Sequence, residues 1–458
     1  MKSMSIRIFA AVLAAGMLAA AVGCDDKNKD TDTSQVQTAD TAIVSETQPQ
    51  QEASDIGEHR DYDKQNANGE YSGGVLVVDQ DGSKRCMEMF TAEEESGQFY
   101  ASELNAMKER LGTQINVYSM AVPTACELYC PSNYRVDIDS QSTIMENIAD
   151  AFVNVKNVDV MQTLINHNAE NIYFRTDTRW TPLGAYYAGR VFAKTAGVPY
   201  ADISEYTPSK AADYVGNMSM FIDYMTLEEL EKDPDEFVYY KPKTKFKTYY
   251  YDENFEFLTD GEFFEEVPEA MYDTFYKGGF YCVKLETEVK SGRKLIIVKD
   301  NAGTALAPFM TSSFDEIYVV DKDYLEANLV EMVEDFKITD VLYCLDMFTI
   351  TSQNVYQLET LRTQATHGRL EDNATDSDAD EPNENADSAI TTDTDSEDNT
   401  GEESEIQYIY DVGLNNSVGV AEPSETSETV EEEPIPEDQY EYDPYYDDGE
   451  DYGYDYEE

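Results

Sequence analysis

The chain has little positive charge. Its 458 residues include 32 Lys and Arg against 94 Asp and Glu, which gives a formal net charge of -62. A polyanion of this kind repels phosphate groups, so the composition excludes a general affinity for nucleic acid or for anionic lipid surfaces. The acidic excess is uneven, because 33 of the 94 acidic residues and no Lys or Arg fall in residues 371–458, and the rest of the chain carries -29.

Histidine and cysteine are also scarce. The three His residues and the six Cys residues show no metal-ligand spacing, so we expect neither a metal site nor a cofactor. Setting aside Cys24, five Cys remain, and an odd number argues against a complete disulfide framework. A local bridge between Cys126 and Cys130 is the alternative to our expectation that these side chains belong to the core.

An apolar run from Ile8 to Val22 follows the basic residues Lys2 and Arg7 and ends at Gly23-Cys24. This order predicts a secretory signal peptide over residues 1–23. Small residues directly before Cys24 indicate a lipobox, so we expect a lipid-modified Cys24 that anchors an extracytoplasmic protein to the membrane. The alternative is an uncleaved signal anchor, but the run is shorter than the roughly 20 apolar residues that span a bilayer.

Composition divides the remaining chain into three parts. Residues 24–72 are rich in Asp, Thr, Ser, Gln and Asn, which predicts a disordered tether. Residues 73–362 have the apolar content of a folded domain. Residues 363–458 are acidic and become rich in Tyr near the end, which predicts a disordered tail that serves for solvation or for capture of a partner.

The folded part alternates strand and helix patterns, which predicts an α/β domain with a mostly parallel central sheet flanked by helices. A hairpin is expected over 75–90. An aromatic-rich stretch, 205–275, interrupts the alternation, and we expect an irregular insertion packed on the main sheet. Further strands are expected at 115–122, 153–160, 295–299, 317–320 and 341–345. Helices are expected from the capping box Thr91–Glu94 to Gly112, around 144–148, at 183–195 and at 325–336.

Two polar segments follow strands. In the first, Asp177 and Trp180 flank Thr178-Arg179, and Thr181-Pro182 marks the start of a helix that should end at Gly197. The second, 300–304, directly follows the strand 295–299. Sites in open α/β sheets form at the carboxyl ends of strands, so we expect both segments to meet in one shallow cleft.

The sequence RTDTRWT followed by GAYY resembles the DHHW family, which is named for Asp-His-His-Trp at this place. Those proteins are SGNH-hydrolase-like and resemble the O-acetyltransferases that modify polysaccharides such as alginate. The segment DNAGT resembles the family's DSYGN, and Gly278-Gly279-Phe280 resembles its GGN. The resemblance implies an acidic residue at Asp177, a His beside it, and a serine nucleophile in the later segment.

At each of these places the present chain departs from the family pattern. The two His positions hold Thr178 and Arg179, the serine position holds Asn301, and the Asn of GGN is Phe280. A guanidinium stays protonated and cannot act as a general base, and an amide cannot attack an acyl carbon. We therefore expect a catalytically inactive domain that binds polar or anionic groups through Asp177, Arg179, Trp180, Asp300, Asn301 and Thr304.

The expected role is binding or scaffolding at the cell envelope, with a cell-surface polysaccharide or an envelope protein as partner. The alternatives are an active esterase or O-acetyltransferase with substitute residues, and a structural protein acting through its acidic tail. Asp177 and Asp300 are either paired acid-base groups or structural carboxylates, with Asp177 bound to Arg175 or Arg179. In a rewired enzyme the nucleophile would be Thr304, Ser312 or Ser313, and the base would be His167.

Several aromatic side chains could either stack on sugars or belong to the core. They are Trp180, Tyr186, Tyr187 and Tyr249–Tyr251.

Limited proteolysis tests the division into tether, domain and tail. Residues 25–72 and 366–458 hold too few apolar side chains to offset the entropy of ordering, so protease should trim both and leave a resistant core near 73–362. Mass spectrometry of the products locates the cuts. Strong protection from hydrogen exchange within residues 371–404 would contradict the expectation.

Overall fold

The computed structural model describes residues 57–265, 271–276, 282–367 and 370. Its strands are β1 Gly69–Ser72, β2 Val75–Gln80, β3 Ser83–Glu88, β4 Asn116–Val122, β5 Lys156–Asn157, β6 Tyr206–Tyr214, β7 Asp235–Pro242, β8 Phe246–Tyr251, β9 Phe257–Gly261, β10 Cys282–Thr287, β11 Lys294–Lys299, β12 Glu316–Asp321 and β13 Asp340–Asp346. Its α-helices are α1 Glu94–Leu111, α2 Ala125–Tyr129, α3 Gln141–Asp150, α4 Met161–Asn166, α5 Pro182–Ala196, α6 Tyr224–Lys232, α8 Leu329–Asp335, α9 Met347–Ile350 and α10 Leu358–Thr363.

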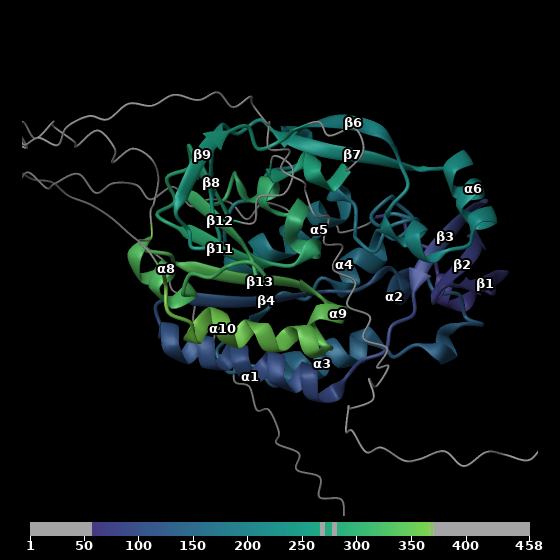
Figure 1. Ribbon diagram of the computed structural model, residues 1–458, viewed down its shortest axis with the longest axis horizontal. Coiled ribbons are helices and arrows are strands. Elements are labelled where there is room, and N and C mark those ends of the chain that lie inside the picture. The colour runs from purple at the N-terminus through teal and green to yellow at the C-terminus, as the bar shows by residue number, and fades with distance from the viewer. Residues whose placement is uncertain (1–56, 266–270, 277–281, 368–369, 371–458) are drawn as a thin grey trace, which may run out of the picture. The chain divides into compact units, whose positions relative to one another are not determined.

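An eight-stranded sheet in the order β5-β4-β13-β11-β12-β10-β8-β9 forms the centre of the domain (Figure 1). The pairs from β5 to β12 are parallel, and the last three pairs are antiparallel. The predicted α/β architecture with a mostly parallel sheet is confirmed. The interpretation of the insertion needs correction, because β8 and β9 extend the edge of the sheet, while β6 and β7 form a separate two-stranded sheet.

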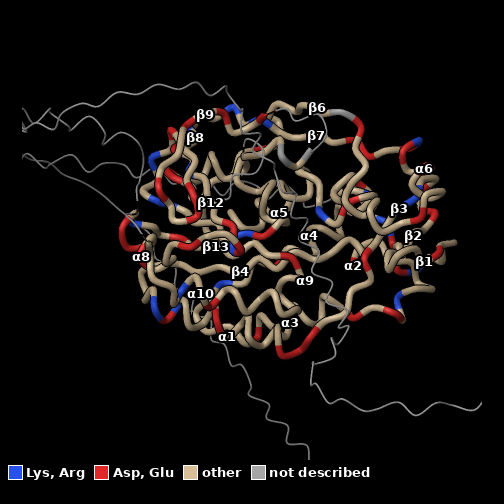
Figure 2. The backbone as a smooth tube through the Cα atoms, viewed as in Figure 1, with Lys and Arg blue, Asp and Glu red and all other residues tan. Residues whose placement is uncertain are grey.

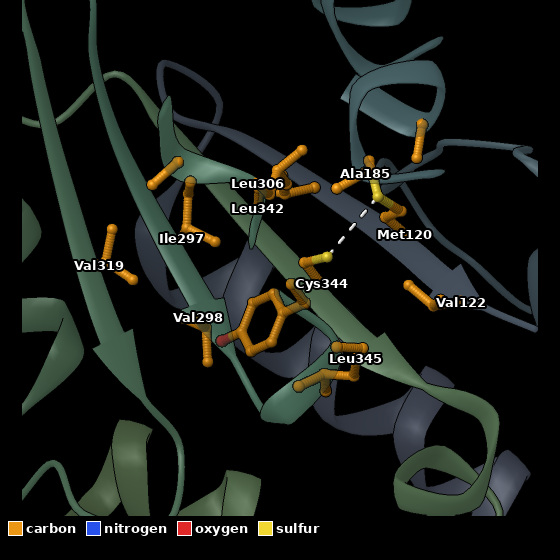
Figure 3. Close-up of a cluster of buried hydrophobic side chains, with 14 of the residues drawn as sticks. Met120, Val122, Ala185, Ile297, Val298, Leu306, Val319, Leu342, Cys344 and Leu345 are labelled. Atoms are coloured by element: carbon orange, nitrogen blue, oxygen red, sulfur yellow. Dashed lines mark hydrogen bonds between the residues drawn. The ribbon is translucent and has the colours of Figure 1, made fainter. Parts of the chain in front are cut away.

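Helices cover both faces of the parallel strands. In Figure 1, α1, α3 and α10 lie together below β4 and β13, and α5 lies on the opposite side. The parallel strands are apolar along their length, as strands covered on both faces must be. Figure 3 shows how side chains from the central strands meet those of α5 and of the turn after β11, with labelled residues Met120, Val122, Ala185, Ile297, Val298, Leu306, Val319, Leu342, Cys344 and Leu345.

The five Cys residues of the described part are free and buried, as the core interpretation predicted. Cys344 Sγ approaches Met120 Sδ at 3.7 Å in the core (Figure 3). Acidic and basic residues are both distributed along the backbone of the described domain (Figure 2). Within the described ranges, no helix has the length and apolar character that crossing a membrane requires.

The N-terminal boundary and one helix cap differ from the sequence-based expectation. The hairpin β2–β3 is present, but β1 adds a third strand to it, so defined structure begins before Gly73. Helix α1 begins at Glu94, two residues later than a capping box at Thr91 requires, because Glu93 occupies the cap position and Thr91 does not cap the helix. Instead, Asp139 Oδ2 accepts a hydrogen bond from the backbone N–H of Ala92 at 3.0 Å and fixes the segment that leads into the helix.

Two other elements are shorter than expected. The strand expected over 153–160 is reduced to β5, because Asn154 has a positive φ of 61°, which extended chain does not allow. The helix expected over 325–336 begins only at Leu329. The side chain of Asn328 accepts hydrogen bonds from the N–H groups of Val330 and Glu331 and so fixes the helix start there.

Helix α5 matches its expected signals. Thr181 caps it, Pro182 is its first residue, and Gly197 ends it in the left-handed conformation with φ of 68°. Gly184 is needed for close approach, since a Cβ there would lie 2.4 Å from the carbonyl oxygen of Ile172. The first turn of α5 therefore packs directly against the backbone of Ile172, in the segment that leads to Asp177.

Replacing Thr181 by Ala should destabilise the domain by about 1–2 kcal/mol. The hydroxyl of Thr181 accepts from Gly184 N at 3.3 Å and donates to Asn171 O at 2.6 Å, so the change removes both a helix cap and a loop contact. Chemical denaturation measures the loss. The control Thr181→Ser keeps the hydroxyl and should cost clearly less; equal losses in the two variants would show that the hydroxyl is not the stabilising group.

Candidate functional site

Asp177 lies on the loop before α5, and its side chain is fully buried. The Arg179 guanidinium donates two hydrogen bonds to this carboxylate, from Nε to Oδ1 at 2.7 Å and from Nη2 to Oδ2 at 2.9 Å. The N–H groups of Arg179 and Asn217 and the hydroxyl of Tyr214 also donate to this carboxylate. Arg175 binds Asp233 and Asp235 instead, so Arg179 is the partner of Asp177.

The charge of Arg179 is neutralised inside this pair. Burial by itself raises the pKa of Asp177, but the positive charge and hydrogen bonds of Arg179 outweigh it, and the pKa lies below its usual value. The guanidinium also lies over the ring of Tyr272, 3.8 Å from its centroid. An anionic ligand would therefore have to compete with Asp177 for Arg179, and the expected affinity for anions loses its basis.

Trp180 joins the two motif segments. Its side chain is 1% exposed, and its indole Nε1 donates to Ala302 O at 2.7 Å. Tyr272 donates its hydroxyl to the carbonyl of Trp180, and Tyr276 does the same to Thr304 at 2.6 Å. The expected convergence of the segments is present through Trp180, but in the described ranges no hydrogen bond or ion pair links Asp177 or Arg179 directly to residues 300–304.

The second segment forms a short 3-10 helix, Asn301–Ala305, at the carboxyl end of β11. Asp300 caps it by accepting from Ala302 N at 2.8 Å, and its other oxygen accepts from Asp346 N at 2.8 Å. Asn301, at the position of the family's serine, is exposed, whereas Thr304 is buried. Asp300 thus has the structural role of a turn carboxylate, and its hydrogen-bond partners in the described residues do not include Asp177.

Two carboxyl groups next to the site were missed in the sequence. Asp346 ends β13 and caps α9, and Glu88 ends β3; both side chains are half-buried. Burial, followed by the negative charges of Asp300 and Glu88, raises the pKa of Asp346 to about 8. Burial and the charge of Asp177 raise the pKa of Glu88 to about 7. Burial also raises the pKa of Asp300.

A sequence signal existed for one of these two residues. Asp346 directly follows an apolar parallel strand, where the rule that sites lie at carboxyl ends applies. Glu88 ends an antiparallel hairpin that belongs to another sheet, and no local pattern marks it as a site residue. Only the packing of the hairpin against the Asp177 loop, where Cys86 N donates to Arg175 O at 2.7 Å, brings it close.

Three of the four substitute catalytic groups, namely His167, Ser312 and Ser313, have structural partners. Nδ1 of His167 lies 2.5 Å from Glu170 Oε1, and the His167 ring stacks on Tyr187 at 3.6 Å. Ser312 accepts from Ala201 N at 3.2 Å, and Ser313 donates to Pro199 O at 2.6 Å. The aromatic side chains considered for sugar stacking are buried, apart from Tyr187, which is half-buried; the buried ones are Trp180, Tyr186 and Tyr249–Tyr251.

In the ranges that the structure describes, no group of three or more His, Cys, Asp or Glu side chains is arranged to hold a metal ion. Gly278-Gly279-Phe280, the segment that resembles GGN, lies outside the described residues.

Comparison with known proteins decides the family. The family model described as "DHHW protein" matches residues 26–320. This chain belongs to the DHHW family. The crystal structure of a DHHW family protein from Eubacterium siraeum DSM 15702 is 36% identical with a TM-score of 0.62, and the match covers 66% of the present chain and 100% of the other. The resemblance read from RTDTRWT and GAYY is confirmed.

More distant matches among solved structures are also found. Bacillus cereus PatB1 with a sulfonyl adduct is 16% identical, with a TM-score of 0.49 and coverage of 64% of this chain and 99% of PatB1. The O-acetyltransferase domain of Pseudomonas putida AlgJ is 15% identical, with a TM-score of 0.35 and coverage of 65% and 100%. These two likenesses are too remote to carry a conclusion about this chain. A search of curated proteins gives no match.

The raised carboxyl pKa values predict that the folded DHHW domain becomes less stable as pH rises from about 5 to about 8. Between those values the folded state keeps protons on Glu88 and Asp346 that the unfolded chain has already released, so the free energy of unfolding falls with pH. Replacing Glu88 by Gln should flatten the slope. Denaturant titrations at several pH values measure it.

Glu70, an exposed residue of β1, offers the matched control Glu70→Gln, which should leave the slope unchanged. His59, whose pKa is raised mainly by its hydrogen bond to Asp61, adds a change of the same sign that both variants retain. Equal slopes in the wild-type protein and Glu88→Gln would show that Glu88 does not titrate in this range.

Proposed function

We propose that this DHHW protein is an extracytoplasmic lipoprotein that binds or scaffolds at the cell envelope and does not transfer acyl groups. The observation that carries the proposal is the bidentate pair between Arg179 and the buried Asp177. It stands where the family pattern has an Asp and a His. The histidine base of the family pattern is therefore missing from this position.

Arg179 cannot replace the missing base. A general base needs a free lone pair on a group that loses its proton near neutral pH, and a guanidinium offers neither. The Asp177 charge beside it makes loss of a proton harder still and holds the pKa of Arg179 above its usual value. In an Asp-His pair the carboxylate orients a base, whereas here it fixes a permanent cation.

The nucleophile position is also unsuited to acyl transfer. Asn301 is exposed at the carboxyl end of β11, so an attacking group there would reach a ligand, but its amide is not nucleophilic. The amide still offers two donors and an acceptor for hydrogen bonds to hydroxyl groups. Asn301 can therefore bind a ligand at this position but cannot attack it.

Sequence features support the proposed envelope location and polysaccharide partner. The signal-like segment 1–23 and Cys24 support export and lipid anchoring, which would place the domain outside the cytoplasm. The resemblance to enzymes that modify polysaccharides supports a glycan or an envelope protein as partner. A catalytically active esterase or O-acetyltransferase with rewired residues is the alternative, and the structural partners of His167, Ser312 and Ser313 weigh against it.

The purified protein should hydrolyse a simple acetyl ester, such as p-nitrophenyl acetate, no faster than the buffer does. The double variant Asn301→Ser/Arg179→His should exceed each single variant, because a nucleophile and its base act as a unit. Initial rates over a series of enzyme concentrations give the measurement. Robust turnover by the wild-type protein that Asp177→Ala abolishes would establish the rewired enzyme instead.

A further inference from the structure

The first described residues, 57–62, form a strap across the corner between α4 and α5, although composition assigns them to the tether. Tyr62 anchors one end of the strap, because its ring is buried and its hydroxyl donates to the carboxylate of Asp81. Gly57 is the other end, where a Cβ would lie 2.1 Å from Nδ1 of His167. The strap therefore packs directly on the His167 ring.

Backbone groups hold the strap at its centre. Glu58 O accepts a hydrogen bond from Ala169 N at 2.9 Å. The side chain of Asn168 binds both backbone groups of Arg60, because it accepts from the N–H at 2.8 Å and donates to the carbonyl at 2.9 Å. The donors and acceptors of these three hydrogen bonds do not titrate, so this part of the attachment is independent of pH.

His59 is the histidine of the strap, and its ring makes the contact that depends on pH. Nδ1 lies 2.9 Å from Ile165 O, and Nε2 lies 2.9 Å from Asp61 Oδ1. Both oxygens are acceptors, whereas a neutral imidazole has a single N–H. Only the imidazolium form of His59 can therefore make both hydrogen bonds, and loss of its proton removes one of them.

The charges near His59 favour the imidazolium form. Hydrogen bonds from His59 and from Lys64, whose Nζ lies 3.1 Å from Oδ2 of Asp61, lower the pKa of Asp61, so this carboxyl group is ionised at neutral pH. The hydrogen bond to Asp61 is in turn the main cause that raises the pKa of His59. The neighbouring charge of Arg60 is engaged by Asp81.

The groups that face the strap from α4 and α5 require a neutral His167. Arg190 can only donate, and it lies 3.4 Å from Nε2 of His167, so that nitrogen acts as an acceptor. Nδ1 then carries the proton and donates to Glu170 Oε1 at 2.5 Å, and the same oxygen accepts from Glu58 N at 3.3 Å. Tyr187 donates to the other oxygen of Glu170 at 2.6 Å. The closed strap thus combines a protonated histidine of its own with a neutral histidine beneath it.

We propose that residues 57–62 are a pH-responsive strap, which closes on the corner between α4 and α5 when His59 is protonated and opens as that proton is lost. The closed strap holds the proton more tightly than the open chain does. Closure is therefore favoured below the ordinary pKa of histidine, about 6.5, and weakens as pH rises through the higher pKa of His59 in the closed strap. Opening moves the point where the chain leaves the domain from Gly57 to Tyr62 and removes the cover of Gly57 from the His167 ring. The inference concerns the attachment of the tether and is independent of the proposed binding function.

Hydrogen exchange of the purified full-length protein, followed by mass spectrometry, tests the strap. The reporters are peptic fragments that contain the backbone N–H groups of Arg60 and Ala169, because both groups donate in hydrogen bonds of the strap. Protection is the exchange rate of an unstructured chain at the same pH divided by the measured rate. From pH 6 to pH 9 we expect protection of these fragments to fall about threefold to tenfold, as the loss of one partly exposed charge-assisted hydrogen bond implies.

Matched variants assign the change to the strap histidine. His59→Asn keeps a donor for Ile165 O but removes the charge, so protection of both reporters should vary by less than about twofold over the same pH range. Asp61→Asn removes the charged acceptor and should reduce the fall. His367→Asn, which replaces an exposed histidine outside the strap, should behave as the wild-type protein does. Circular dichroism at each pH verifies that every variant is folded.

Constant protection in the wild-type protein, or an equal fall in His59→Asn, would overturn the inference. The second result would assign the pH dependence to another group, either His167 or the carboxyl groups of Glu88 and Asp346 acting through global unfolding. Gly57→Ala provides a reference for the open strap, because its Cβ does not fit against the closed packing, and it should show low protection at both pH values. Wild-type protection in Gly57→Ala would also overturn the inference.

Discussion

The buried carboxylate of Asp177 is the constraint around which this site is built. A carboxylate removed from water needs a cation or several donors, or it takes up a proton and loses its charge. Here Arg179 supplies the cation in a fixed two-point geometry, and backbone and tyrosine donors complete the shell. Removing one partner of such a pair typically costs about 3–5 kcal/mol, because the other charge remains buried and uncompensated.

The same pair holds the loop before α5 in place with an Arg where the family pattern has a His. An Asp-His arrangement holds a group that must gain and lose a proton, whereas Asp177 and Arg179 form a permanent ion pair that serves stability. Trp180 continues the connection by donating to Ala302 at the start of the second segment. The two halves of the site are therefore fixed relative to each other by contacts that do not involve a nucleophile.

Local sequence signals predicted the parts of the fold that local forces determine. Thr181, Pro182 and Gly197 mark the ends of α5 through their own hydrogen bonds and backbone preferences, and the structure agrees. The place of β8 and β9 was not predictable in this way, because their aromatic residues suit both a sheet edge and a packed insertion. The pairing of β8 with β10 decides between them, and it joins residues far apart in the sequence.

The site was predictable only where a strand end or a family motif marks it. Asp177, Trp180 and Asp300 carry such marks, and the structure brings their segments together. Glu88 carries none, because its position depends on how a separate hairpin packs against the Asp177 loop. Prediction from one sequence finds groups that the chain places locally and misses groups that a second sheet contributes.

Charge balance links these observations. Arg179 and Asp177 form a closed ion pair. Burial raises the pKa values of the neighbouring Glu88, Asp346 and Asp300, so these carboxyl groups keep their protons to higher pH than isolated carboxyl groups do. With an Arg at the family's His position, the charge of Asp177 is therefore compensated over the physiological pH range, whereas the charges of its neighbours depend on pH.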